Sequence, residues 1–163
     1  MLLIVFGLPG AGKTYLGQLL KDEFGFYFYD GDRDLTDEMK KALKEKKLFN
    51  DSMRDIFFQR LKIRILRLHK TKKHLVVAQT FIKEKYRKQL LKAMPFARFI
   101  LVQTKKVLGE KRLLQRNDLH LNYVKKMITL FEKPTVEHFK IENDTDGKIQ
   151  LIKKLEKILH NQK

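Results

Sequence analysis

The segment GLPGAGKTY, residues 7–15, combines flexible small residues with a lysine and hydroxyl groups. Gly7, Gly12, Lys13 and Thr14 satisfy the spacing G-x-x-x-x-G-K-[ST] of a phosphate-binding loop. Glycines let backbone N–H groups approach phosphate oxygens, and a helix beginning near Lys13 would direct its positive end to the same oxygens. Lys13 would contact the β- and γ-phosphates, and the Thr14 hydroxyl would coordinate Mg²⁺. The expected ATP-binding residues are Gly7, Leu8, Pro9, Gly10, Ala11, Gly12, Lys13, Thr14 and Tyr15.

Two carboxylates follow the next apolar run, in the sequence FYDGDRD. Asp30 and Asp32 are two positions apart, so in an extended chain their side chains point to the same side. Beside a phosphate loop, such a pair suits phosphoryl transfer at a bound acceptor substrate. Asp30 would help to hold Mg²⁺ through water, and Asp32 would orient the acceptor hydroxyl and take its proton. The alternative is an ordinary acidic turn.

A third group of polar residues lies in EKRLLQRNDLH. Arg112 and Arg116 are four positions apart, share one face of a helix, and precede a loop from Asn117 to His120. Planar guanidinium groups suit phosphate oxygens, and a mobile lid that carries them would exclude water. We predict catalytic roles for both arginines, an ATP contact for Arg112, and a helical lid over roughly 112–133. The alternative is a pair of solvated surface arginines.

The elements that must position these residues are apolar runs of strand length that alternate with helical patterns. Strands are expected at 2–6, 26–29, 75–78, 99–102 and 139–141, and their continuous apolar character is typical of strands covered on both faces. Helices are expected between them, one capped by Asp51 and the last by Asp144 or Thr145. This alternation predicts an α/β fold with a five-stranded parallel sheet, in one domain over residues 1–163. Ligands of such sheets bind at the carboxyl ends of the strands.

Composition narrows the class of protein further. The formal net charge of +17 favours anionic ligands. The chain has no cysteine, which excludes disulfides and thiolate metal sites. No apolar run is long enough to span a bilayer and the first residues do not resemble a signal peptide, so we expect no membrane partner and a cytoplasmic location. The guanine-reading motif N-K-x-D of GTPases is absent, and the run LVVA ends in Gln79, where a hydrolytic ATPase usually has an acid.

Together, the phosphate loop, the D-G-D segment and the arginine pair resemble the small-metabolite kinases of the nucleotide-monophosphate-kinase-like group. Within this group the resemblance is greatest to gluconate kinases and somewhat weaker to shikimate kinase. The likeness continues through Asp51 and Arg54, through KEKYRKQLL with Lys83, Tyr86 and Arg87, and through RLLQR…H and FEKP. It implies a three-layer α/β/α P-loop nucleoside triphosphate hydrolase fold with a closing lid.

The same resemblance implies an activity and its cofactors. ATP and Mg²⁺ would serve transfer of the γ-phosphate to a hydroxyl of a small, often anionic metabolite. Arg54 and Arg87 would hold the anionic group of this acceptor, and Lys83 and His120 would also bind it.

The sequence departs from the gluconate kinase pattern on the acceptor side. A histidine and an asparagine after D-G-D are replaced by Leu35 and Met39, and two small residues become Thr80 and Phe81. We therefore predict a kinase without assigning gluconate to it. One alternative is a polynucleotide-type 5′-hydroxyl kinase, whose basic clusters between residues 60 and 73 would bind nucleic acid. A second is a non-catalytic ATP-binding module. The favoured partner is a small-molecule substrate, and the protein is expected to be a monomer or a homodimer.

Overall fold

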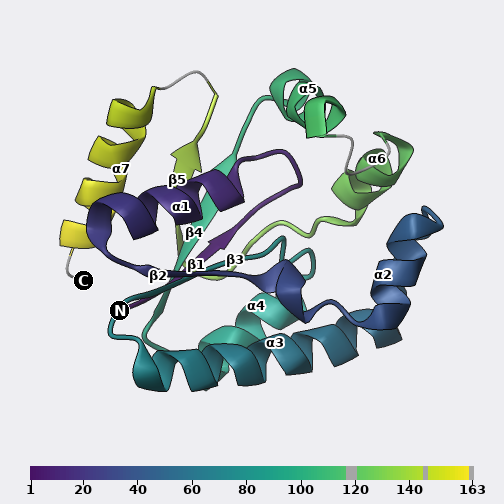
Figure 1. The fold of residues 1–163 in the computed structure, drawn as a ribbon, viewed down its shortest axis with the longest axis horizontal. Helices are drawn as coiled ribbons and strands as arrows, with labels where there is room; N and C mark the ends of the chain where they lie inside the picture. The colour runs from purple at the N-terminus through teal and green to yellow at the C-terminus, as the bar shows by residue number, and fades with distance from the viewer. Residues whose placement is uncertain (117–120, 145–146, 162–163) are drawn as a thin grey trace.

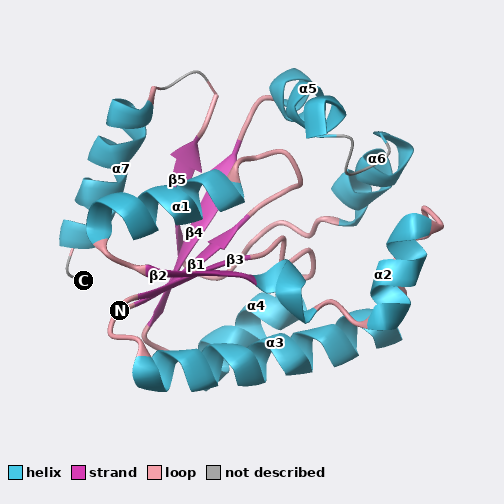
Figure 2. Ribbon diagram, viewed as in Figure 1, coloured by secondary structure: helices cyan, strands magenta, loops and turns pink. Residues whose placement is uncertain are grey.

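The computed structural model describes residues 1–116, 121–144 and 147–161. Seven α-helices, one short 3₁₀ helix and five strands lie within these ranges (Figures 1 and 2). In chain order they are β1 (Leu2–Phe6), α1 (Lys13–Phe24), β2 (Tyr27–Asp30), η1 (Gly31–Asp34), α2 (Asp37–Lys44), α3 (Asp51–Thr71), β3 (Leu75–Ala78), α4 (Glu84–Ala93), β4 (Ala97–Gln103), α5 (Lys106–Arg116), α6 (Leu121–Leu130), β5 (His138–Glu142) and α7 (Lys148–His160).

All five strands are parallel, in the order β2-β3-β1-β4-β5. The central strand β1 pairs Leu2 with Leu75 on one side and with Ala97 on the other. Every residue of β1 is buried, because both faces of a parallel sheet are covered by the helices that connect its strands. The predicted five-stranded parallel sheet is confirmed.

Helices cover both faces of the sheet. Because side chains alternate along a strand, Leu3 and Val5 of β1 pack with α1 and α7, whereas Leu2, Ile4 and Phe6 pack with α3 and α4. Figure 1 shows α1 and α7 on one side of the strands and α3 and α4 on the other. The predicted three-layer α/β/α arrangement is therefore confirmed. None of the helices in the described part of the chain is long and apolar enough to cross a membrane.

Two predicted helix caps are wrong. Helix α3 is capped by Asn50, whose Oδ1 accepts a hydrogen bond from Met53 N at 2.8 Å, and not by Asp51. Helix α7 has Gly147 at its N-cap. Asp144 instead accepts hydrogen bonds from Lys105 N at 2.6 Å and from the Thr104 hydroxyl at 3.0 Å, because the chain after β5 runs beside the end of β4. Thr145 lies outside the described residues.

Candidate active site

A cavity of about 400 Å³ opens where β1, β2 and β3 end. The phosphate loop contributes Lys13 and Thr14 to its wall, and the segment after β2 contributes Asp30 and Asp32. Its opposite side is formed by side chains of α2 and α3, which follow one another in the chain, and of α6, which comes much later in the sequence. The position agrees with the general location of ligands at the carboxyl ends of parallel strands.

The loop between β1 and α1 forms a cradle. Gly10 and Gly12 have φ angles of 79° and 96°, which L side chains rarely adopt. A Cβ at Gly12 would collide with the side-chain amide of Asn143, which itself donates a hydrogen bond to the Ala11 carbonyl at 2.9 Å. Helix α1 begins at Lys13 and therefore directs the N–H groups of its first turn to this loop. The geometry fits the binding of phosphate groups.

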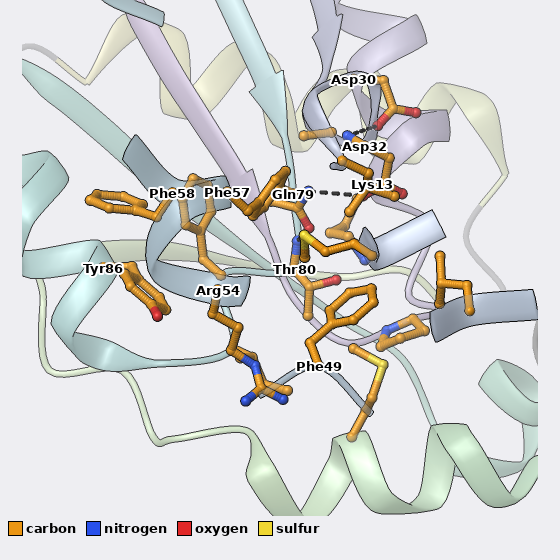
Figure 3. Close-up of a pocket in the computed structure, with 18 of the residues that line it drawn as sticks. Lys13, Asp30, Asp32, Phe49, Arg54, Phe57, Phe58, Gln79, Thr80 and Tyr86 are labelled. Carbon is orange, nitrogen blue, oxygen red and sulfur yellow. Dashed lines mark hydrogen bonds between the residues drawn. The ribbon is translucent and has the colours of Figure 1, made fainter. Parts of the chain in front are cut away.

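The two carboxylates lie together, but not in the extended geometry that the spacing suggested. Strand β2 ends at Asp30, and Asp32 lies in the 3₁₀ turn η1. Asp30 Oδ1 accepts a hydrogen bond from Asp32 N at 3.0 Å, so its side chain caps the turn. Asp32 Oδ1 accepts one from Gln79 Nε2 at 2.8 Å, and Figure 3 shows both bonds beside Lys13. A tight turn, and not strand alternation, brings both acids to the cavity.

The Asp32 carboxyl has a raised pKa. The residue keeps considerable solvent-exposed surface, yet its carboxyl group lies inside the cavity among many protein atoms. The exposed surface of Asp32 faces this confined volume, so the carboxyl group is shielded from bulk water. This burial is the largest effect on the pKa and raises it. The hydrogen bond from Gln79 and the charge of Lys13 lower it again, whereas the neighbouring Asp30 charge raises it.

Replacing Gln79 by leucine tests this balance. The variant loses the hydrogen bond that favours the charged form of Asp32, so the pKa of that carboxyl should rise further above its ordinary value. A base with a higher pKa is protonated up to a higher pH. The acid limb of the kcat/KM profile should therefore move to higher pH in Gln79→Leu, measured by ADP release between about pH 5 and pH 8.

A matched control is Gln59→Leu, because Gln59 lies on the exposed surface of α3. Its acid limb should coincide with that of the unmodified protein. An unshifted or downward-shifted limb in Gln79→Leu would show that Asp32 does not govern the pH dependence.

Arg54 is a cation in the wall of the cavity opposite the phosphate loop. It lies in the first turn of α3, and its Nη1 is 3.3 Å from Asp51 Oδ1. The Arg54 side chain is only 11% exposed, whereas that of Asp51 is 74% exposed. A largely buried guanidinium paired with a solvated carboxylate can exchange that partner for the anionic group of a ligand, because exposed ion pairs contribute little. Arg54 thus lies in the cavity wall, and its expected contact with the acceptor stays a prediction.

The structure does not place Arg87 at the cavity. Its side chain is 0% exposed and lies between the rings of Phe6 and Phe131. Its guanidinium pairs with Glu84 and donates to the carbonyls of Phe81 and Glu132, both at 2.6 Å. This position does not support the expected substrate-binding role, because each of the three guanidinium nitrogens already donates a hydrogen bond within the protein.

Lys83, also expected at the acceptor, is not among the residues that line the cavity. Its Nζ lies 3.1 Å from Glu132 Oε1, in the same cluster that holds Arg87. The expected role of Lys83 in substrate binding is therefore not supported by its position. Lys83 and Arg87 both match the kinase motif in sequence, but their packing partners hold them away from the cavity.

The two lid arginines differ in what the structure describes. Arg112 of α5 reaches the phosphate loop, with Nη1 3.4 Å from the Gly10 carbonyl and Nη2 3.4 Å from the Asp144 carbonyl. This position suits the expected ATP contact. The backbone of Arg116 ends α5, whereas its side chain and His120 lie outside the described residues.

Sequence reasoning assigned no role to three features of the site. Gln79 orients Asp32, Asn143 braces the phosphate loop, and a set of large apolar side chains lines the rest of the cavity. Gln79 and Asn143 each directly follow a strand, at the carboxyl edge of the sheet. Because ligands bind at this edge, their position in the sequence could have indicated a role in the site. The departures at Leu35, Met39 and Phe81 indicated part of the apolar wall. The contributions of Phe49, Phe57 and Tyr123 were not predicted, because no local pattern connects these positions.

The residues of the site fit ATP with Mg²⁺. The glycine cradle would hold the phosphate groups, and the Thr14 hydroxyl and Asp30 lie in the same cavity. Within residues 1–116, 121–144 and 147–161, no group of three or more His, Cys, Asp or Glu is arranged to hold a metal ion by itself. Mg²⁺ at such sites usually takes most of its ligands from substrate phosphates and water.

This sheet order, with the loop GLPGAGKT between β1 and α1, defines a P-loop protein of the kinase-like type. The sequence profile of the shikimate kinase family matches residues 9–118, and the chain belongs to that family. Kinases of this family use ATP, typically with Mg²⁺.

A curated relative, a probable gluconokinase of Xenopus tropicalis, is 31% identical over 91 residues, which cover 56% of this chain. The match spans about half of that relative, 48% of its length.

Solved structures share the fold. A sugar kinase from Janibacter sp. has a TM-score of 0.83 at 19% identity and covers 97% of this chain and 93% of its own. A gluconokinase from Sinorhizobium meliloti has a TM-score of 0.75 at 19% identity, over 97% and 94% of the two chains. Shikimate kinase from Acinetobacter baumannii, solved with shikimate, has a TM-score of 0.67 at 20% identity, over 99% and 94%. At these identities the likeness shows the fold.

Proposed function

We propose that this protein transfers the γ-phosphoryl group of ATP to a hydroxyl of a small, anionic metabolite. The observation that carries the proposal is that the Asp32 carboxylate lies in one cavity with the phosphate loop and with Arg54. A donor site, a proton acceptor and a cation for the acceptor substrate thus meet in about 400 Å³. Family membership supports the same reaction class.

In this reaction the acceptor oxygen forms a bond to the γ-phosphorus, and the bond from that phosphorus to the oxygen shared with the β-phosphate breaks. ADP leaves, and the hydroxyl proton passes to Asp32. The transition state is loose, so positioning and charge neutralisation supply most of the catalysis. Lys13 and the loop amides would hold the phosphates. Thr14, and Asp30 through water, would hold Mg²⁺, which would supply positive charge to neutralise the phosphates.

We further propose that α5 and α6 act as a lid over the phosphates. Arg112 already lies against the phosphate loop, and α6 contributes side chains to the cavity wall. Closure would exclude water and limit hydrolysis of ATP. The expected contributions of Arg116 to catalysis and of His120 to acceptor binding stay predictions.

Neither alternative function is favoured. A nucleic acid kinase needs a basic track that leads the strand into the site, yet Lys13 and Arg54 are the cations among the cavity-lining residues that the structure describes. A purely ATP-binding module would not need a second cation and an oriented carboxylate on the far side of the phosphate loop.

The proposal predicts ADP release in the presence of ATP, Mg²⁺ and one compound from a panel of hydroxyl-bearing acids. Lys13→Ala should abolish this release, because the lysine would neutralise the phosphates in the transition state. Single-stranded DNA should not stimulate ADP release at any salt concentration. Binding of ATP with no acceptor-dependent ADP release over the whole panel would refute the proposal.

A further inference from the structure

The acceptor half of the cavity has a mostly apolar wall. Leu35 lies in the segment after η1, and Met39 lies in α2. Phe49 lies in the loop before α3, and Phe57 lies in α3 itself. Tyr123 of α6 completes the wall, with its ring 6.4 Å from that of Phe49 in an edge-on arrangement. Side chains from three separate regions of the chain thus present carbon atoms to the same volume.

Gln79 and Tyr86, two of the polar side chains near this wall, already have partners within the protein. Both ends of the Gln79 amide are used, by Asp32 and by Thr80 N at 2.5 Å. The Tyr86 hydroxyl donates to Asp55 Oδ1 at 2.8 Å, on the outer side of the helices. A polyol in this space would place several hydroxyl groups against carbon and leave them without hydrogen bonds, which is costly in a desolvated site.

Phe81 gives the wall a fixed shape. Its φ angle is +45°, a rare conformation for a bulky residue, and its side chain lines the cavity while being 5% exposed. Arg87 Nη1 donates to its carbonyl oxygen at 2.6 Å and holds this conformation. Backbone strain of this kind is maintained where surrounding structure enforces it, often in ligand sites. The apolar wall is therefore a built surface of the cavity.

From these observations, and resting on the proposed kinase function, we infer that the acceptor is an amphipathic hydroxy acid. It carries one anionic group for Arg54, a hydroxyl that reaches Asp32, and between them an unsubstituted ring or hydrocarbon chain. Among the cavity-lining residues that the structure describes, Arg54 supplies the guanidinium, and it accounts for the single anionic group. The carbon wall accounts for the body, since each apolar atom that enters it gains binding free energy. In the phosphorylation step, the hydroxyl oxygen of this acid replaces ADP on the γ-phosphorus, and its proton passes to Asp32.

The first test compares defined probes as phosphate acceptors. We expect 4-(hydroxymethyl)benzoate or 6-hydroxyhexanoate to show a kcat/KM at least about tenfold above that of gluconate, measured by ADP release. Binding of the same compounds is measured separately by calorimetry, in the presence of a non-hydrolysable ATP analogue and Mg²⁺. A preference for gluconate in both measurements would overturn the inference and leave the kinase proposal intact.

Binding of the apolar acids without any ADP release would support the inferred ligand class and contradict the kinase function. The acceptor class would stand as a ligand class, and the kinase proposal would fail. Absence of both binding and turnover for every probe would overturn both. The two hypotheses therefore fail by different results.

A second test uses variants of the wall and of the cation. Leu35→His places a polar ring in the cavity and should reduce the preference for 6-hydroxyhexanoate over gluconate by about tenfold. The matched control Leu66→His, at an exposed position of α3, should leave the preference unchanged. Arg54→Met should weaken binding of 4-(hydroxymethyl)benzoate about 30-fold or more while leaving neutral benzyl alcohol unaffected. Equal losses for the charged and neutral probes would contradict the assignment of Arg54.

Discussion

Replacing Asp32 by asparagine is expected to lower kcat by about 10² to 10⁴-fold while leaving the KM for ATP almost unchanged. The amide cannot take the hydroxyl proton, but the phosphate loop and Lys13 stay in place. The side-chain oxygen of asparagine can still accept the hydrogen bond from Gln79. Steady-state ADP release with a saturating acceptor measures the loss.

The same variant should not be less stable than the unmodified protein. Burial raises the pKa of Asp32, so the folded state disfavours the charged carboxylate, and a neutral side chain of the same shape removes that cost. Urea unfolding of Asp32→Asn would therefore separate a catalytic defect from a folding defect. The exposed Asp22→Asn serves as the control and should change neither quantity. Nearly normal turnover in Asp32→Asn would remove Asp32 from the reaction.

Replacing Arg87 by methionine is expected to lower the free energy of unfolding by about 3 to 5 kcal/mol. The change leaves the Glu84 carboxylate without its arginine partner and the carbonyls of Phe81 and Glu132 without their donors. Arg87→Lys should recover only part of the loss, because one ammonium group cannot reach all three acceptors with the planar geometry of a guanidinium. Denaturant unfolding measures both variants, and the exposed neighbour Lys88→Met is the matched control.

The acid sensitivity of this cluster gives a second measurement. Burial alone would raise the pKa of Glu84, but hydrogen bonds from Thr135 and Arg87 outweigh it and lower the pKa to about 2. A carboxyl with a lowered pKa stabilises the folded state above its ordinary pKa of 4.5, and this stabilisation is lost as the pH falls from there to about 2. The unmodified protein should lose this contribution on acidification, and Arg87→Met should lose less. Unchanged stability in Arg87→Met would contradict the structural role assigned to Arg87.

The sequence alone predicted the parts of the protein that depend on local patterns. Continuous apolar runs identified β1 and β3 to the residue, because strands covered on both faces have no polar positions. The phosphate loop was equally readable, since its glycines, lysine and threonine work at fixed spacing along one segment. The carboxylates after β2 followed from their position at the end of a strand, although the turn that orients them did not.

The tertiary structure decided how side chains from distant segments are used. Arg87 and Arg54 are both arginines in kinase-like motifs, and only packing distinguishes them. Glu84, Glu132 and two aromatic rings enclose Arg87, whereas Arg54 faces the cavity with a solvated partner. The apolar acceptor wall arises in the same way, from residues of α2, α3 and α6 that become neighbours only when the chain folds. Spacing along the chain carries no information about such neighbours, because each of them is brought to the cavity by a different element.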